Sequence, residues 1–103
     1  MTEAELQRAV VDMAQTFGWM VAHFRPAPTS KGWRTPVAAD GAGFPDLVMA
    51  KDRVVFVELK GDNGRVSEHQ KKWGAKLAAA GAEYHLWTPA DWKAGNVDRV
   101  LVP

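Results

Sequence analysis

The stretch that decides the fold runs from Gly43 to Gly61 and reads GFPDLVMAKDRVVFVELKG. Its two apolar segments, residues 46–50 and 53–60, are joined by a Lys-Asp pair, and this pattern predicts a tight β-hairpin. Three charged side chains interrupt the apolar segments: Asp46, Glu58 and Lys60. Because burying an unpaired charge costs several kcal/mol, these side chains either face solvent or form a site.

Before this hairpin, the sequence predicts a helix, a strand and a long loop. Thr2 followed by Glu5 fits a capping box, and apolar residues at helical spacing extend the helix to Phe17. Residues 19–24 are aromatic and β-branched, which predicts a strand. Residues 26–45 contain four prolines and little periodicity, which predicts a loop. A loop of this length is more often functional than idle.

After the hairpin, the sequence predicts a second helix and a further strand. Ser67 with Gln70 three residues later repeats the capping-box pattern, and the helix extends to Ala80, with Gly81 as its left-handed cap. The remaining predicted elements are a strand, a short helical turn and an extended segment, at residues 83–87, 89–92 and 97–102. The order helix, strand, strand, strand, helix, strand predicts an α/β fold with helices packed on a central mixed sheet.

The composition predicts one domain that covers residues 1–103. Hydrophobic residues make up 47% of the 103-residue chain, which is enough for a single core. The absence of cysteine excludes disulfides and thiolate metal sites. The acidic N-terminus does not resemble a signal peptide, and no apolar run approaches the roughly 20 residues that span a bilayer. We therefore expect a soluble protein in the cytoplasm.

A basic and aromatic segment precedes the hairpin, although the net charge is only +1. Residues 13–39 contain no carboxylate. Basic and aromatic side chains without counter-charge suit phosphate and base contacts, so we predict nucleic-acid contacts here, although a loop can also be basic without a role. The predicted contact residues in this segment are Arg25, Lys31, Trp33 and Arg34.

The charged residues of the hairpin also have a chemical interpretation. Two carboxylates that converge at the ends of adjacent strands, here Asp46 and Glu58, can hold Mg²⁺, which prefers oxygen ligands. Such an ion polarises a phosphate and lowers the pKa of a bound water. Lys60 lies about 7 Å from Glu58 along the same strand face and can offset charge on the phosphate. Taken singly, Asp46 is equally a turn residue, Lys60 a solvated lysine, and Glu58 its ion-pair partner.

These motifs resemble those of a known nuclease superfamily. FPDLVM followed by VELKG resembles the PD-(D/E)xK signature, and VSEHQKKWGAKLAAAGAEYHLW resembles the VRR-NUC family within it. The resemblance covers nearly the whole chain and implies a restriction-endonuclease-like αβββαβ core. It implies that Asp46, Glu58 and Lys60 are catalytic, that Mg²⁺ or Mn²⁺ is the cofactor, and that the Leu59 backbone carbonyl is a further metal ligand.

The resemblance also assigns roles to one residue of each helix. Glu3 lies on the core-facing line of the first helix, whereas Glu5 is used by the capping box, so Glu3 is the candidate for the helix-one acid that such nucleases bring to the metal. Gln7, one turn on, is placed to assist it. Gln70 lies on the line that faces the sheet, and the resemblance implies that it is catalytic. Alternatively, Glu3 only complements the helix dipole and Gln70 only closes its capping box.

Further basic and aromatic residues surround the second helix. Lysines on an exposed helix face are usually only solvated, yet several here are placed to follow a DNA backbone. The residues with this prediction are Arg65, Lys71, Lys72 and Lys76. Two tryptophans, Trp73 and Trp87, are expected in the core.

The resemblance implies a metal-dependent endonuclease acting on DNA. Stand-alone members of this size are similar to phage and bacterial Holliday junction resolvases, which act as homodimers, so we expect a homodimer that cuts four-way junctions. The resemblance implies no nucleotide cofactor and no membrane. Alternatives are a sequence-specific, flap or nicking endonuclease and, from another class, a non-catalytic DNA-binding or interaction module of a larger complex.

Overall fold

The two strands of the predicted hairpin form the centre of the sheet. The structure is a computed structural model that describes residues 1–24, 27–34 and 37–103. In it, β4 (Leu47–Ala50) pairs antiparallel with β5 (Val54–Leu59). Alternation along β5 places Val55, Val57 and Leu59 on one face, and all three are buried. The predicted hairpin is confirmed.

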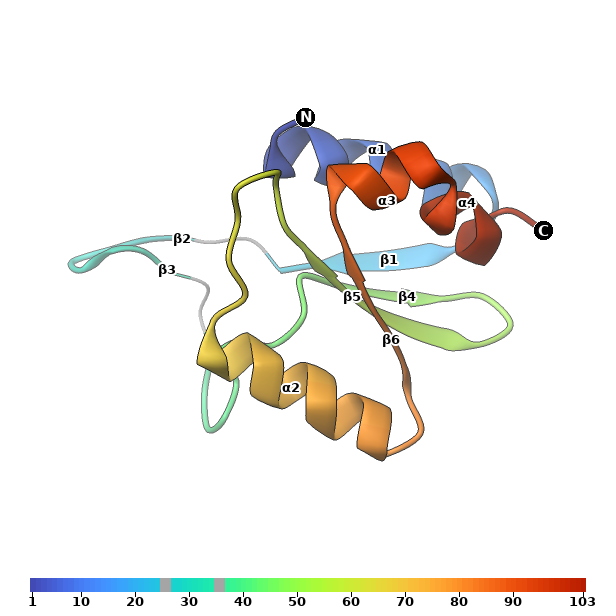
Figure 1. Ribbon diagram of the computed structural model, residues 1–103. Helices are drawn as coiled ribbons and strands as arrows, with labels where there is room; N and C mark the ends of the chain where they lie inside the picture. Colours follow the sequence, from blue (N-terminus) through green and yellow to red (C-terminus); the bar gives the residue numbers. More distant parts are fainter. Residues whose placement is uncertain (25–26, 35–36) are drawn as a thin grey trace.

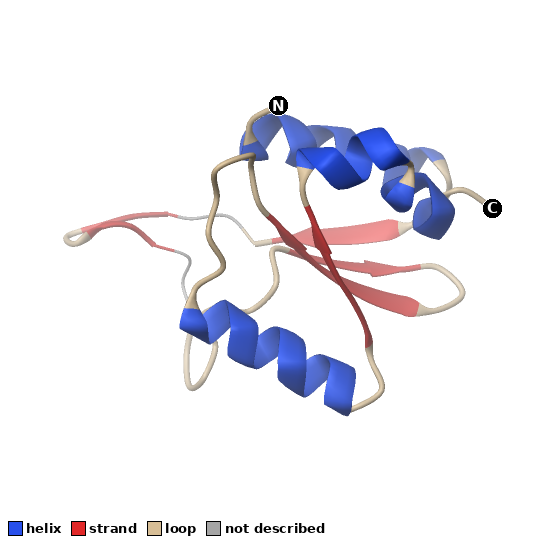
Figure 2. Cartoon of the chain, viewed as in Figure 1, coloured by secondary structure: helices blue, strands red, loops and turns tan. Residues whose placement is uncertain are grey.

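A four-stranded mixed sheet is built around this hairpin. β1 (Met20–His23) pairs antiparallel with β4, and β6 (Glu83–Trp87) pairs parallel with β5, which gives the order β1-β4-β5-β6. A parallel pair needs a crossover connection, and α2 (Glu68–Ala79) supplies it (Figure 1). The predicted α/β fold, a restriction-endonuclease-like αβββαβ core with a central mixed sheet flanked by helices, is confirmed (Figure 2).

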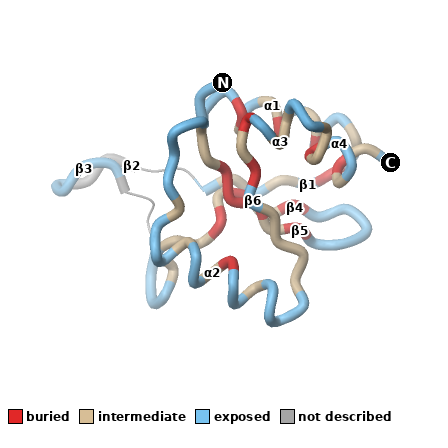
Figure 3. Tube along the Cα trace, viewed as in Figure 1, coloured by how far each residue is buried: buried red, intermediate tan, exposed pale blue. Residues whose placement is uncertain are grey.

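Helices cover the sheet from two sides. α1 (Glu3–Thr16), α3 (Pro89–Ala94) and α4 (Asn96–Leu101) lie on one side, and α2 lies on the other (Figure 1). α1 packs on the sheet through residues four apart in sequence, Leu6, Val10 and Ala14, all of them buried. Buried positions also lie along the central strands of the sheet (Figure 3). Among the described residues, no helix is both long and apolar enough to cross a membrane.

A second, small hairpin occupies part of the predicted loop. β2 (Ala27–Thr29) pairs antiparallel with β3 (Gly32–Arg34), and the hairpin projects from the body of the protein (Figure 1). The prediction of a loop throughout residues 26–45 is therefore wrong over this hairpin. Strands of three residues are too short to show a two-residue period, which explains why the pattern was not visible.

The C-terminal segment is helical, so the prediction of an extended segment at residues 97–102 is wrong. Gly95 has a φ of 80° and reverses the chain between α3 and α4. Val97 and Leu101 lie one helical turn apart and are both buried. β-branched residues favour strands locally, but burial of this apolar stripe against α1 and the sheet determines the result.

The segment at residues 37–45, here called the 37–45 loop, packs against α2. Phe44, near its C-terminal end, makes edge-to-face contacts with Phe24, Phe56 and Trp73, at ring distances of 5.5, 6.1 and 5.0 Å. Gly43 has a φ of 80°, and a Cβ added there would lie 2.5 Å from the His69 carbonyl carbon. The loop backbone therefore presses directly on the first turn of α2.

Replacing Gly43 with alanine should destabilise the protein more than the same change at Gly81. Both glycines have positive φ, which costs a residue with a side chain about 1 kcal/mol. Only Gly43 is also packed against backbone, whereas nothing lies within 4 Å of a Cβ at Gly81. We expect Gly43→Ala to cost roughly 2–4 kcal/mol and Gly81→Ala about 1 kcal/mol in urea unfolding. Equal losses would contradict the close packing of the loop on α2.

Candidate active site

Two acidic side chains meet where β4 begins and β5 ends. Asp46 directly precedes β4, and Glu58 is the penultimate residue of β5. Because Leu47 pairs with Val57, Asp46 and Glu58 are neighbours across the ladder. Asp46 Oδ2 accepts a hydrogen bond of 2.8 Å from the Leu59 backbone N–H. The structure therefore brings together the two carboxylates predicted to hold a metal.

Among the described residues, Glu58 is the only charged residue that is buried, with 1% of its surface exposed. Burial, the hydrogen bond with Asp46 and the charge of Asp46 raise its pKa to about 9. Lys60 opposes this rise, with Nζ 3.8 Å from Glu58 Oε2. A carboxyl held in this way is neutral near pH 7 unless a further cation compensates its charge.

Gln70 closes the capping box of α2 and also contacts Glu58, while its catalytic role stays a prediction. Its Oε1 accepts a 2.9 Å hydrogen bond from the Ser67 backbone N–H and closes the capping box of α2. Its Nε2 donates a 3.1 Å hydrogen bond to Glu58 Oε2. One side chain thus defines the start of α2 and orients a buried carboxyl.

Glu3 lies at the rim of the acidic pair. The Gly61 backbone N–H donates to its carboxylate, while partial burial and the charge of Asp46 raise its pKa. Gly61 packs closely here, since a Cβ added to it would lie 3.1 Å from the Glu3 backbone nitrogen. Glu5 closes the capping box with Thr2, as predicted.

Two other predictions concern Gln7 and the tryptophans. The Gln7 amide contacts His23 Nδ1 at 3.2 Å, and its assistance to Glu3 stays a prediction. Trp73, expected in the core, is only partly buried and donates from Nε1 to the Asp40 carbonyl at 2.9 Å. Trp87 is 3% exposed, so its prediction as a core residue is confirmed.

The oxygen atoms of the acidic pair suit a divalent cation. Asp46 and Glu58 offer hard oxygen ligands, and their carboxyls lie close enough to share a proton, a position that a cation can take instead. In the described ranges, no group of three or more His, Asp or Glu side chains is arranged to hold a metal. The pair therefore fits Mg²⁺ or Mn²⁺ through two carboxylates. Metal binding by Glu3 and by the Leu59 carbonyl stays a prediction.

Asp46, one of the two acids, lines a cleft of about 520 Å³. The 37–45 loop forms most of its wall, and Asp46 and Gln70 line it from the sheet and α2. Phe24 contributes the remaining side. A substrate group that enters this cleft reaches Asp46.

The predicted nucleic-acid contacts lie on or near the surface. Trp33 is 69% exposed on the small hairpin, beside the exposed Lys31. Arg25 lies outside the described residues, as does the side chain of Arg34. The predicted contacts around α2, all exposed, are Arg65, Lys71, Lys72 and Lys76. Their contact with DNA stays a prediction.

One neighbour of the acids was not predicted from the sequence. Burial and the charges of Glu58 and Asp46 raise the pKa of the Tyr84 hydroxyl. Tyr84 pairs with Phe56 across the parallel ladder, on the face that α2 covers. No local motif marks this tyrosine, and only the position of β6 beside β5 brings it near the site.

Replacing Glu58 with glutamine should stabilise the protein in EDTA. The folded pKa of Glu58 is about 9 and its ordinary value 4.5, so between these values the folded state binds a proton that the unfolded state releases. Stability of the original protein therefore falls as the pH rises through this window. Glu58→Gln removes that loss, and we expect a gain of about 2 kcal/mol or more at pH 8 in urea unfolding.

Glu83→Gln is the matched control with the opposite sign. The Arg53 guanidinium, which donates to Glu83 at 2.7 Å, lowers the pKa of Glu83, with a smaller effect of His85. The stability that Glu83 contributes is present above its ordinary pKa and is lost as the pH falls through the folded value. We expect Glu83→Gln to cost roughly 0.5–1 kcal/mol at pH 7. A destabilising Glu58→Gln would contradict the buried, proton-sharing pair.

The comparison with known families agrees with this geometry. The model of the VRR-NUC domain matches residues 33–88, which is more than half of the chain. The matched range contains Asp46, Glu58, Lys60 and Gln70, and Glu3 precedes it. A comparison with curated proteins found no match. The chain belongs to the VRR-NUC family and is a nuclease domain of the PD-(D/E)xK superfamily.

Proposed function

We propose that this domain is a metal-dependent endonuclease that hydrolyses phosphodiester bonds of DNA. The observation that carries the proposal is the buried Glu58 carboxyl, which lies beside Asp46 and 3.8 Å from the Lys60 ammonium. Asp46 and Gln70, its two neighbours, line a cleft. A buried acid is costly, so a fold keeps it where its charge has a use. Membership of a nuclease family indicates that use.

Asp46 and Glu58 are the residues that hold the cation, Mg²⁺ or Mn²⁺. When bound, the cation polarises a phosphate and lowers the pKa of a water molecule near it. Asp46 is fixed for this task by the Leu59 N–H, and Glu58 by the Gln70 amide. Each carboxylate is therefore held in a set orientation by a hydrogen bond, which lowers the cost of organising the site.

Lys60 places its ammonium beside the same carboxyl. Its side chain is 15% exposed, so its charge acts where water screens it weakly. It offsets the negative charge that builds on the phosphate during attack, or it holds the attacking water. Glu3, at the rim, accepts from the Gly61 N–H and adds a further acid that faces Asp46.

We propose branched DNA, above all the four-way junction, as the substrate, and a homodimer as the active form. A chain of 103 residues offers little surface for reading a long base sequence. A four-way junction has approximate two-fold symmetry, and paired incisions need two sites, whereas one chain supplies one. The projecting hairpin with its exposed Trp33 is the proposed arm for junction contact.

Cleavage should depend on Lys60 and on a divalent cation. We expect Lys60→Ala to lower the cleavage rate of a labelled junction by roughly 10²–10³-fold in Mg²⁺ or Mn²⁺, and EDTA to abolish cleavage. Lys51→Ala, an exposed lysine in the β4–β5 turn, is the matched control and should cleave normally. If no substrate is cut while DNA binding persists, the domain is a binding module and the nuclease proposal is wrong.

Substrate choice and assembly give a separate test. Four-way junction, splayed arm, flap, duplex and single-stranded DNA are incubated in parallel, and we expect paired nicks on the junction. Light scattering after size exclusion should give twice the 11.3 kDa chain mass. Cutting at one position of plain duplex would instead identify a sequence-specific enzyme, and single nicks on flaps by a monomer would contradict the resolvase assignment.

A further inference from the structure

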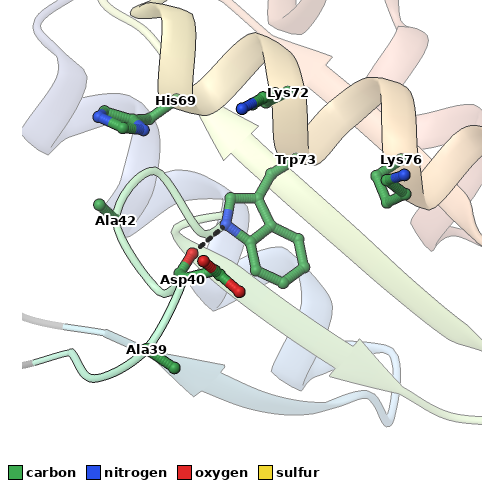
Figure 4. A pocket seen from close by; sticks show the side chains of 7 residues that line it. All are labelled: Ala39, Asp40, Ala42, His69, Lys72, Trp73 and Lys76. Atoms are coloured by element: carbon green, nitrogen blue, oxygen red, sulfur yellow. Dashed lines mark hydrogen bonds between the residues drawn. The ribbon is translucent and has the colours of Figure 1, made fainter.

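A second cavity lies beside the proposed active site, between the 37–45 loop and the outer side of α2. It has a volume of about 410 Å³, within the range of small-ligand sites, and we call it the Trp73 pocket. Figure 4 shows its lining: Ala39, Asp40, Ala42, His69, Lys72, Trp73 and Lys76. Ala42 also lines the active-site cleft, so the two cavities lie on either side of the same loop.

The Trp73 indole forms a fixed aromatic wall of this pocket. Its Nε1–H donates to the Asp40 carbonyl at 2.9 Å, and its ring meets Phe44 edge-on at 5.0 Å. In Figure 4 the ring extends from α2 toward the loop and stands between His69 and Lys76. An aromatic ring held at its edge and exposed on part of its surface is suited to stacking against a flat ligand.

The charged groups of the pocket are mostly basic. Lys72 and Lys76 are both exposed on α2, and His69 lies one turn before Trp73. The single carboxylate among the lining residues belongs to Asp40. Lysines beside an aromatic face attract a phosphate while the ring stacks on a base. In duplex DNA both faces of a base are covered by neighbouring bases, so only an unpaired nucleotide offers both groups.

We propose that the Trp73 pocket binds an unpaired nucleotide at the branch point of the DNA substrate. This inference rests on the proposed function and narrows its substrate to branches that carry an unpaired nucleotide. His69 is adjacent in sequence to Gln70, which contacts Glu58, so the pocket lies along α2 from the acids. A nucleotide held there positions the neighbouring strand at the active-site cleft.

The test compares two four-way junctions that differ only by unpaired thymidines at the branch. Fluorescence anisotropy in the Lys60→Ala background measures their affinities without cleavage. We expect about tenfold tighter binding of the junction with unpaired thymidines. Replacing these thymidines by abasic residues should remove most of the preference. Equal affinity for the two junctions would overturn the proposal.

Variants of the pocket residues test whether the preference for unpaired thymidines depends on the Trp73 pocket. The double variant Lys72→Ala with Lys76→Ala should reduce the preference for unpaired thymidines to less than about threefold. Trp73→Ala should have the same effect, whereas Trp73→Phe should retain the preference. Because both lysines are exposed, their double variant tests the proposal even if Trp73→Ala fails to fold. Lys51→Ala is the control, because Lys51 is an exposed lysine in the β4–β5 turn and does not line the pocket. An unchanged preference in the double-lysine variant would overturn the proposal.

Cleavage by the protein with Lys60 intact separates this inference from the proposed function. If the protein cleaves DNA in Mg²⁺ but does not prefer the junction with unpaired thymidines, the proposal for the Trp73 pocket alone is wrong. A pocket-dependent preference without cleavage of any DNA refutes the nuclease proposal alone and leaves a branch-binding domain.

Discussion

The burial of the Glu58 carboxyl beside Asp46 is the constraint on which the rest of the site depends. Two neighbouring acids, one of them buried, cannot both be charged unless other groups stabilise the charge. The fold supplies such groups from separate elements. Lys60 comes from the end of the same strand, and Gln70 from the first turn of α2. The environment of the Glu58 carboxyl therefore depends on the hairpin register, on the start of α2 and on the β5–α2–β6 crossover.

The position of α2 follows from close packing at two glycines, one in the helix and one in the 37–45 loop. Gly74 faces Tyr84 so closely that a Cβ would lie 2.8 Å from the ring. Gly43 meets the first turn of the helix from the other side with even less room. These two close approaches fix the helix between the 37–45 loop and β6, and the Gln70 amide consequently reaches Glu58. Packing at glycine thus determines hydrogen bonding at the acids.

Local patterns predicted the parts of this protein that local interactions determine. The two-residue alternation placed Glu58 and Lys60 on one face, and the Ser67–Gln70 spacing located the start of α2. The same patterns failed where tertiary contacts decide. Val97 and Leu101 suit a strand or a helix, and only burial selects the helix. Trp73 has the spacing of a core residue, but it packs against the 37–45 loop instead of the core and is only partly buried.

Family membership assigns the chemistry of this domain more firmly than its substrate, because Asp46, Glu58 and Lys60 lie on or directly beside β4 and β5 while the walls of the cleft are mostly loop residues. Here the 37–45 loop walls both the active-site cleft and the Trp73 pocket. It is fastened to the sheet and α2 through Phe44, and to Trp73 through the Asp40 carbonyl. The proposed nucleotide pocket and the proposed active-site cleft therefore share one wall, and this wall belongs to a segment that the catalytic motif does not include.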